Sequence, residues 1–231
     1  AYATNSIGTS YGNEISFSTT SVAPSFACGI ATVSDIDNNT YNTVQIGNQC
    51  WTQGNLKVSK YRNGDNIPTG LSNSAWENTT SGAYAIYNND PVNDGLYGKL
   101  YNHYAVADSR GLCPTGWHVP TDGEWMTLEN HLGGPSVAGG ALKSTATQPT
   151  LGGWNSPNTV ATNSSGFKAI PGGKRFNHGI FDEVGHSAYS WSSSVTQVDW
   201  AWNRILYFSS GGIFRSMSLR TDGSSVRCLK D

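Results

Sequence analysis

Charged residues are scarce in this sequence. Asp, Glu, Lys and Arg make up 13 % of its 231 residues, and the formal net charge is −2. Basic residues form no cluster, so the chain lacks the electrostatic footprint that contact with a phosphate backbone requires. We therefore expect no nucleic-acid partner.

Long apolar runs are also missing. No stretch approaches the roughly 20 residues that a membrane-spanning helix needs, and no lysine-led hydrophobic signal opens the sequence. We expect no membrane insertion, and we expect the chain to begin after a processing site or inside a longer polypeptide.

The sequence has none of the motifs that announce common catalytic sites. It contains no G-x-S-x-G elbow, no paired-carboxylate motif and no nucleotide loop, and its five histidines show no H-x-x-x-H spacing. We therefore predict no catalytic residue, no metal site and no cofactor. Asn89, Asp90 and Asp94 could form an oxygen-rich calcium loop, but a solvated turn is the favoured interpretation.

Cysteine occurs four times, with no C-x-x-C spacing that would favour zinc or thioredoxin-like chemistry. An even number of cysteines favours two disulfides and an oxidising compartment. Three pairings are possible. We favour Cys28 with Cys50, which brackets one hairpin, and Cys113 with Cys228, which ties the last strand to the middle of the domain.

Glycine, serine, threonine, asparagine and aromatic residues are abundant, including 27 Gly, 8 Trp and 11 Tyr. This composition indicates short strands and polar turns and excludes a helical bundle. The clearest helix begins at Thr121 with a Thr-x-x-Glu capping box and ends at Gly133-Gly134. Residues 138–144 predict a second, short helix, and residues 31–46 predict a hairpin around Asp37-Asn38-Asn39.

The N-terminal residues differ from the rest. Residues 1–20 resemble the tail of a fibronectin-III-like module whose final strand would cover residues 14–18. Residues 21–27 are expected to be a linker, and residues 28–231 are expected to form the main domain.

Several segments of that domain resemble the Fibrobacter succinogenes major paralogous domain family. The resemblance is carried by TYNTVQIGNQCW at 40–51, YGKLYN at 97–102, CPTGWHVPT at 113–121, WSSS at 191–194 and SVRC at 225–228. It implies an α+β domain with a C-type-lectin-like fold: one main helix, a second short helix, small twisted antiparallel sheets and long loops. The calcium-dependent sugar motifs of true C-type lectins are absent.

The C-terminal stretch also resembles the variable segment of proteins diversified by retroelements. Within 202–208 the side chains should alternate, and the family pattern of an Arg and a Leu at Arg204 and Leu206 suggests that this face belongs to the scaffold. The opposite face would then be free to contact a partner. The predicted ligand-binding residues are Asp199, Trp200, Trp202, Asn203, Ile205, Tyr207, Phe214, Ser216, Ser218 and Arg220.

These observations predict an extracellular, cell-surface or phage-borne module, not an enzyme, that recognises a protein or glycan ligand. A structural or adhesion domain without a selected ligand site is the alternative. The sequence leaves the oligomeric state open.

Overall fold

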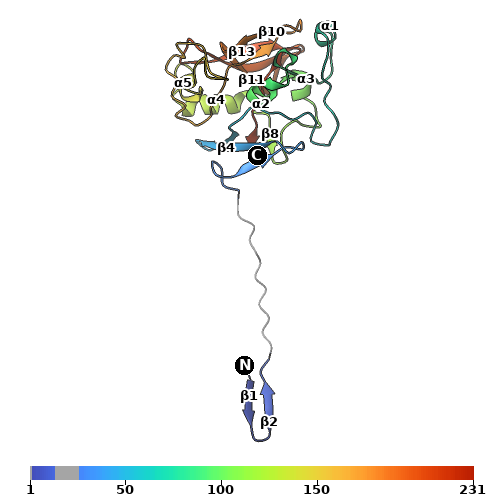
Figure 1. Cartoon of the computed structure of the whole chain (residues 1–231), viewed down its shortest axis with the longest axis vertical. Coiled ribbons are helices and arrows are strands. Elements are labelled where there is room, and N and C mark those ends of the chain that lie inside the picture. The colour runs from blue at the N-terminus through green and yellow to red at the C-terminus, as the bar shows by residue number, and fades with distance from the viewer. Residues whose placement is uncertain (1, 14–25) are drawn as a thin grey trace.

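A computed structural model describes residues 2–13 and 26–231 of the chain (Figure 1). The N-terminal part of it is a two-stranded hairpin of β1 (Tyr2–Asn5) and β2 (Gly8–Tyr11). The strand predicted over 14–18 and residues 21–25 of the predicted linker lie outside the described residues.

The main domain is built on two sheets: the smaller is antiparallel throughout, as expected, whereas the larger also contains the parallel pair β9–β11. The smaller one has five strands in the spatial order β3-β4-β5-β15-β8, namely Thr32–Ser34, Thr40–Ile46, Gln49–Thr52, Leu229–Lys230 and Trp117–His118. β3 and β4 pair antiparallel around the predicted Asp37-Asn38-Asn39 turn, which confirms the hairpin predicted there. The chain therefore closes by inserting its last strand, β15, between β5 and β8.

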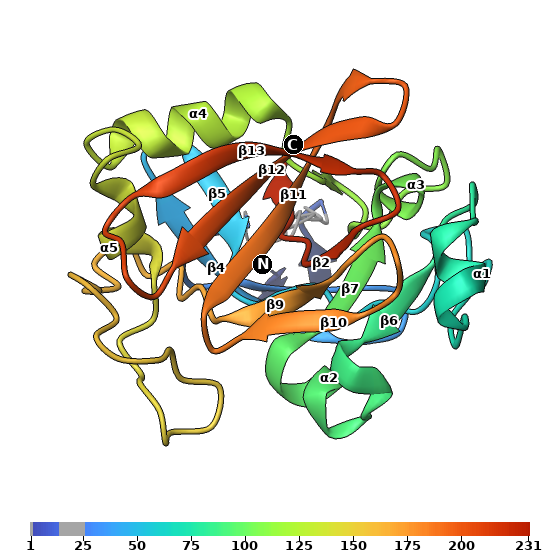
Figure 2. The ribbon, with the colours of Figure 1, turned by 90° about the horizontal axis from the view of Figure 1, so that it is seen from above.

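The larger sheet has eight strands. Seven follow the order β13-β12-β11-β9-β14-β7-β6, and β10 pairs with β9. Their bounds, in that order with β10 last, are Ile213–Leu219, Trp200–Tyr207, Ser187–Gln197, Gly172–Arg175, Gly223–Ser224, Lys99–Asn102, Tyr84–Ile86 and Phe181–Val184. In Figure 2, β13, β12 and β11 lie side by side, with α4 running alongside them.

Helices are few and mostly short, and together with the strands they give the predicted α+β class. α4 (Asp122–His131) begins at the predicted Thr121 capping box, and α5 (Ala138–Leu142) is the predicted short helix. The sequence did not predict the others: α1 (Asn73–Glu77), η1 (Tyr87–Asn89), α2 (Val92–Tyr97) and α3 (His103–Val106). Each is shorter than two turns, so none carries a periodic apolar pattern.

The domain has two main hydrophobic cores. One gathers Trp191, Tyr101, Tyr61 and Trp117 around the Cys113–Cys228 disulfide. In the other, Trp125 and Leu128 of α4 pack against side chains from both sheets and from the long loops. These include Trp51, Trp154, Phe167 and Leu206. The cores occupy the space between helices and sheets, which leaves the outer surface of the β12–β13 hairpin for other contacts.

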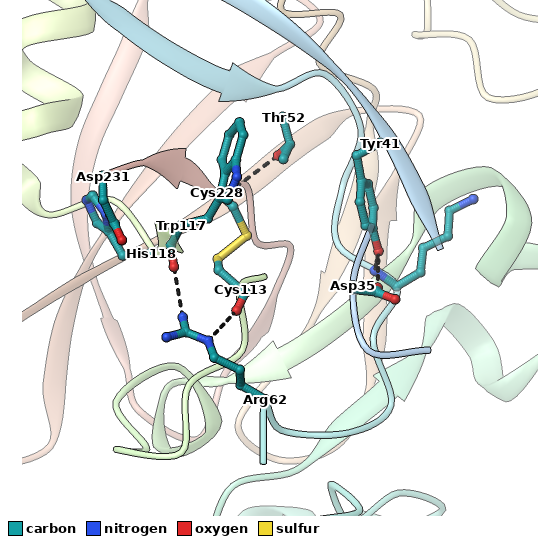
Figure 3. The surroundings of a disulfide bond; sticks show 10 residues. Asp35, Tyr41, Thr52, Arg62, Cys113, Trp117, His118, Cys228 and Asp231 are labelled. Atoms are coloured by element: carbon teal, nitrogen blue, oxygen red, sulfur yellow. Dashed lines mark hydrogen bonds and ion pairs between the residues drawn. A yellow bond between two sulfur atoms is a disulfide. The ribbon is translucent and has the colours of Figure 1, made fainter. Parts of the chain in front are cut away.

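Both disulfides have the predicted pairing, Cys28 with Cys50 and Cys113 with Cys228. The second links residues 115 positions apart and lies in the core. Around it, Arg62 donates to the carbonyl oxygens of Cys113 and Trp117, and the Cys228 amide donates to Thr52 (Figure 3).

Buried cations hold the long loops together. The Lys143 ammonium donates to the carbonyl oxygens of Thr159, Tyr207 and Ser210 at 3.0, 3.0 and 2.7 Å. Arg175 donates to Gly179 and Leu71 in the same way, while its guanidinium stacks on Trp76. A loop buried without secondary structure needs donors for its carbonyl oxygens, and these side chains supply them.

None of the helices in the described part of the chain is long and apolar enough to cross a membrane.

Candidate ligand-binding surface

The candidate surface is the outer part of the β12–β13 hairpin, which rests on helix α4. Thr121 caps α4 with its hydroxyl, and Glu124 reaches back to the Thr121 amide at 2.7 Å. Trp125 and Leu128 are buried in the same core as Leu206 of β12. Because the cap fixes where the helix begins, it also fixes the acidic side chains of the helix beneath the hairpin.

An ion network joins α4 to the hairpin. Arg204, whose side chain is 1 % exposed, pairs with Glu129 and donates to Asp122 at 2.8 Å. Asp122 also accepts two hydrogen bonds of 2.9 Å from Arg215 on β13. Burial alone would raise the pKa of Asp122, but the bonds from Arg215 and Arg204 outweigh it and hold that pKa below its usual range.

Trp202 is held in place by the same network. The guanidinium of Arg215 lies 3.2 Å from the centre of its ring, and Met217 is its cross-strand partner. Arg215 is thus fixed by Asp122 on one side and stacked on Trp202 on the other. A half-buried aromatic side chain held in this way loses little conformational freedom on binding.

Side chains alternate between the two faces of β12 as predicted, but the face expected to be free is mostly buried. Arg204 and Leu206 are buried against α4, as expected for a scaffold face. On the opposite face Tyr207 is half-buried, but Asn203 is fully buried and Ile205 is only 7 % exposed. Asn203 instead donates to the Ser218 hydroxyl at 2.7 Å, and Ser218 is buried as well. Asn203, Ile205 and Ser218 are therefore buried within the hairpin and do not offer side chains to a partner.

The same face continues to an aromatic pair, of which Phe214 is exposed and Tyr207 half-buried. The rings of Tyr207 and Phe214 meet edge to face with centres 5.2 Å apart, and Phe214 is 44 % exposed. Ser216 lies half-buried further along β13. Aromatic side chains beside small hydroxyls are the usual make-up of adaptable binding surfaces.

Among the described residues, β13 is the edge of the larger sheet, since it pairs there with β12 alone. At the start of the strand the Ile213 amide donates away from β12, to the Pro135 carbonyl oxygen at 2.8 Å. Alternation in an antiparallel pair then turns the backbone groups of Arg215 and Met217 outward too. Arg215 and Met217 are exposed on this edge.

A pocket of about 350 Å³ lies at the open end of the hairpin, and we call it the end pocket. Asp199 and Arg220 line it from the hairpin, and Tyr104, Thr79 and Glu77 line it from the opposite wall. Arg220 stacks on Tyr104 with 4.4 Å to the ring centre, and its buried Nε has no hydrogen-bond partner among the described residues. The pocket therefore combines an aromatic ring, hydroxyls, carboxylates and an unused N–H donor.

The structure divides the ten predicted site residues into three groups. Asp199 and Arg220 lie in the end pocket; Asn203, Ile205 and Ser218 are buried; the remaining five, Trp200, Trp202, Tyr207, Phe214 and Ser216, are exposed or half-buried on the hairpin. We call these five, together with Arg215 and Met217, the hairpin surface. Arg215, Met217 and Tyr104 were not predicted from the sequence. Alternation along β13 is the signal that was not used for Arg215 and Met217, which lie across from Arg204 and Trp202.

Histidines and carboxylates elsewhere play structural parts. His118 bonds to Asp231 at 2.6 Å and to Glu124 at 3.0 Å; burial opposes its protonation, but these carboxylates outweigh burial and raise its pKa. Asp94 pairs with Lys99 at 2.8 Å, and Asp90 accepts from the Val92 amide. Within residues 2–13 and 26–231, no group of three or more His, Cys, Asp or Glu side chains could hold a metal ion.

One protein family matches this chain. The model of the Fibrobacter succinogenes major domain aligns with residues 44–230, which include the end of β4, all of α4 and the whole β12–β13 hairpin. No curated protein and no solved structure matches the chain significantly.

Proposed function

The chain belongs to the Fibrobacter succinogenes major domain family, and from this we propose that it is an extracellular module that binds a protein or glycan ligand through its hairpin surface and end pocket. Its two disulfides fit an oxidising compartment. The C-type-lectin-like architecture and diversification of the hairpin by a retroelement are parts of the same proposal.

One observation carries the proposal: the hairpin presents large side chains that the fold already holds rigid. Trp202 is clamped by Arg215, and Arg215 by Asp122 on a capped helix. Aromatic residues, Met and Arg are enriched where proteins meet, and rigid anchors lose less entropy on binding than flexible ones. No reacting group is needed, because recognition rests on shape and aromatic contact.

A glycan array and a panel of surface proteins, probed with the full chain, would identify a ligand. The variant Trp202→Ala/Phe214→Ala then removes one anchor from each face of the hairpin. We expect it to weaken binding about 30-fold or more, as for paired anchors of an interface. Its thermal unfolding should stay close to that of the wild type, since both side chains are partly exposed.

A matched control removes two apolar side chains elsewhere, in Met126→Ala/Ile180→Ala, which are 45 % and 49 % exposed. This control should bind as the wild type does. Equal binding by both double variants would place the ligand away from the hairpin, and the absence of any ligand would favour the alternative of a structural or adhesion domain.

Diversification has its own test in the gene's neighbourhood. A reverse transcriptase and a near-identical template copy of the segment from Trp191 to Asp222 would support it. Substitutions spread evenly among close relatives, with no such template, would argue against it and leave a fixed binding surface.

A further inference from the structure

A second pocket, which shares no lining residue with the hairpin surface or the end pocket, has a volume of about 420 Å³. Its walls come from β4, from the segment that follows β5, from the end of α2 and from the loop over residues 144–152. This size falls in the range of small-ligand sites, roughly 300–1,000 Å³. We call it the basic pocket, for the reason that follows.

The charged residues that line it are all cations: Lys57, Lys168 and Arg227. No Asp or Glu is among its lining residues, although the whole chain carries a net charge of −2. Cations gathered in a concave, partly desolvated site strengthen one another's attraction for an anion. The charge of the pocket is therefore opposite in sign to that of the molecule.

Arg227 is the buried one of these three cations, and none of its hydrogen-bond partners is a carboxylate. Its guanidinium donates to Asn55 Oδ1 at 2.7 Å and to the carbonyl oxygens of Thr52 and Phe167 at 3.1 and 2.9 Å. These partners are dipoles, not charges, and burial lowers the pKa of Arg227 to about 9. A bound anion would supply the counter-charge that is missing.

Two acidic residues adjoin lining residues of the pocket, and both already have partners. Asp94, next to the lining residue Gly95, pairs with Lys99 at 2.8 Å. Asp35 accepts from the Tyr41 hydroxyl at 2.7 Å and from Asn39 at 2.9 Å. Neither carboxylate lines the pocket, so neither neutralises it from within.

The other lining groups suit a sugar. The exposed Asn42 amide and the Gln53 Oε1 can bond hydroxyls, since Gln53 Nε2 already donates to the Gly166 carbonyl oxygen at 2.7 Å. Leu96, Leu151 and Ile170 supply an apolar wall. A hexuronate presents a carboxylate, several hydroxyls and an apolar C–H face on one ring. A peptide segment offers few hydroxyls for the two amides.

We propose that the basic pocket binds the carboxylate-bearing sugar of an acidic polysaccharide, a hexuronate. Lys57 and the exposed Lys168 contact the carboxylate, and Arg227 acts through its charge from the base of the pocket. The proposal is independent of the hairpin surface and needs neither metal nor cofactor.

The test is a titration of the full chain with D-glucuronate. Binding is measured by calorimetry or by the NMR shifts of pocket residues. D-glucose serves as the neutral counterpart of the same shape. We expect saturable binding of glucuronate, about tenfold or more tighter than that of glucose, equivalent to roughly 1.4 kcal/mol. Raising the salt from 0.05 to about 0.5 M should weaken it several-fold, because both lysines lie where salt reaches them.

The variant Lys168→Gln should weaken glucuronate binding about threefold to tenfold and leave glucose unaffected. Lys230→Gln is the matched control: it makes the same charge change on an exposed lysine outside the pocket and should bind as the wild type does. Both lysines are exposed, so neither variant should change the thermal unfolding.

Three results would overturn the proposal: equal affinity for glucuronate and glucose, equal loss in both lysine variants, or no shift of pocket residues at saturating glucuronate. A peptide with a free C-terminal carboxylate that binds in place of glucuronate would reassign the pocket to protein ends. The variant Trp202→Ala/Phe214→Ala should bind glucuronate normally, which separates this test from that of the hairpin.

Discussion

A buried histidine makes the stability of this domain sensitive to pH. His103 is fully buried at the start of α3; its Nε2 lies 3.1 Å from the Ser192 carbonyl oxygen, and its ring packs edge to face on Trp191. Its other nitrogen, Nδ1, has no hydrogen-bond partner among the described residues. Burial is the main reason why its pKa falls from 6.5 to about 4.

The domain should lose stability in mild acid because of His103. The unfolded chain binds a proton there below about pH 6.5, and the folded domain does not until about pH 4. At 1.36 kcal/mol per pH unit, the contribution of His103 to the free energy of unfolding falls by about 3 kcal/mol over that interval. In His103→Gln, whose amide can still donate to Ser192, urea titrations from pH 7 to 4 should show a much shallower fall.

His178→Gln is the control for that experiment, because His178 is exposed. It should reproduce the pH dependence of the wild type. If His103→Gln also does so, the histidine does not stay neutral in the fold.

Lys143 works by donating hydrogen bonds to three loop carbonyl oxygens, and its side chain is fully buried. The change Lys143→Met keeps the apolar stem and removes the donors. We expect the free energy of unfolding to fall by about 2–3 kcal/mol, since buried acceptors without a partner are costly. Urea denaturation measures the loss, and Lys230→Met, at an exposed position, should be nearly neutral.

Each of the two predicted helices contains a glycine, and the space around these two glycines differs. Gly123 in the first turn of α4 has open space: an added Cβ would meet nothing nearer than the Thr121 hydroxyl at 4.0 Å. Gly139 in α5 packs against the β12–β13 turn, and a Cβ there would lie 2.1 Å from the Gly212 carbonyl oxygen. Helix propensity alone would favour alanine at both positions.

We therefore expect the same substitution to have opposite signs at the two glycines. Gly123→Ala should raise the free energy of unfolding by up to about 1 kcal/mol. Gly139→Ala should lower it by about 1–3 kcal/mol, because backbone has to move to admit the methyl group. Chemical denaturation of both variants tests this; a stabilising Gly139→Ala would mean that α5 does not pack on the turn.

At the scale of the whole molecule, the Cys113–Cys228 disulfide links the middle of the chain to its C-terminal end. Its two cysteines are 115 residues apart, whereas Cys28 and Cys50 are 22 apart. In the chain-entropy account a longer closed loop restricts the unfolded state more. The difference between the two bridges is about 1.5 kcal/mol.

Removal of the long-range bridge, as Cys113→Ala/Cys228→Ala, should lower the free energy of unfolding by about 4–5 kcal/mol. Removal of the short one, as Cys28→Ala/Cys50→Ala, should cost about 3 kcal/mol. Urea denaturation of the two double variants compares them. The reverse order would mean that the unfolded state already keeps residues 113 and 228 close together.

The sequence by itself determined the features that depend on nearby residues or on covalent chemistry. The Thr121–Glu124 cap, the hairpin around Asp37-Asn38-Asn39 and the α+β class follow from local patterns, and four cysteines allow only three pairings. Alternation along β12 likewise put Arg204 and Leu206 on one face, and the resemblance to the family identified that face as scaffold.

The tertiary structure alone decided which residues of that hairpin remain exposed. Alternation tells on which side of a strand a side chain lies, but what covers that side comes from segments distant in sequence. Asn203 and Ile205 are buried for that reason, whereas Arg215 reaches Asp122 across 93 residues and holds Trp202 at the surface. The basic pocket is likewise assembled from segments between Thr40 and Arg227, and no local pattern could bring their cations together.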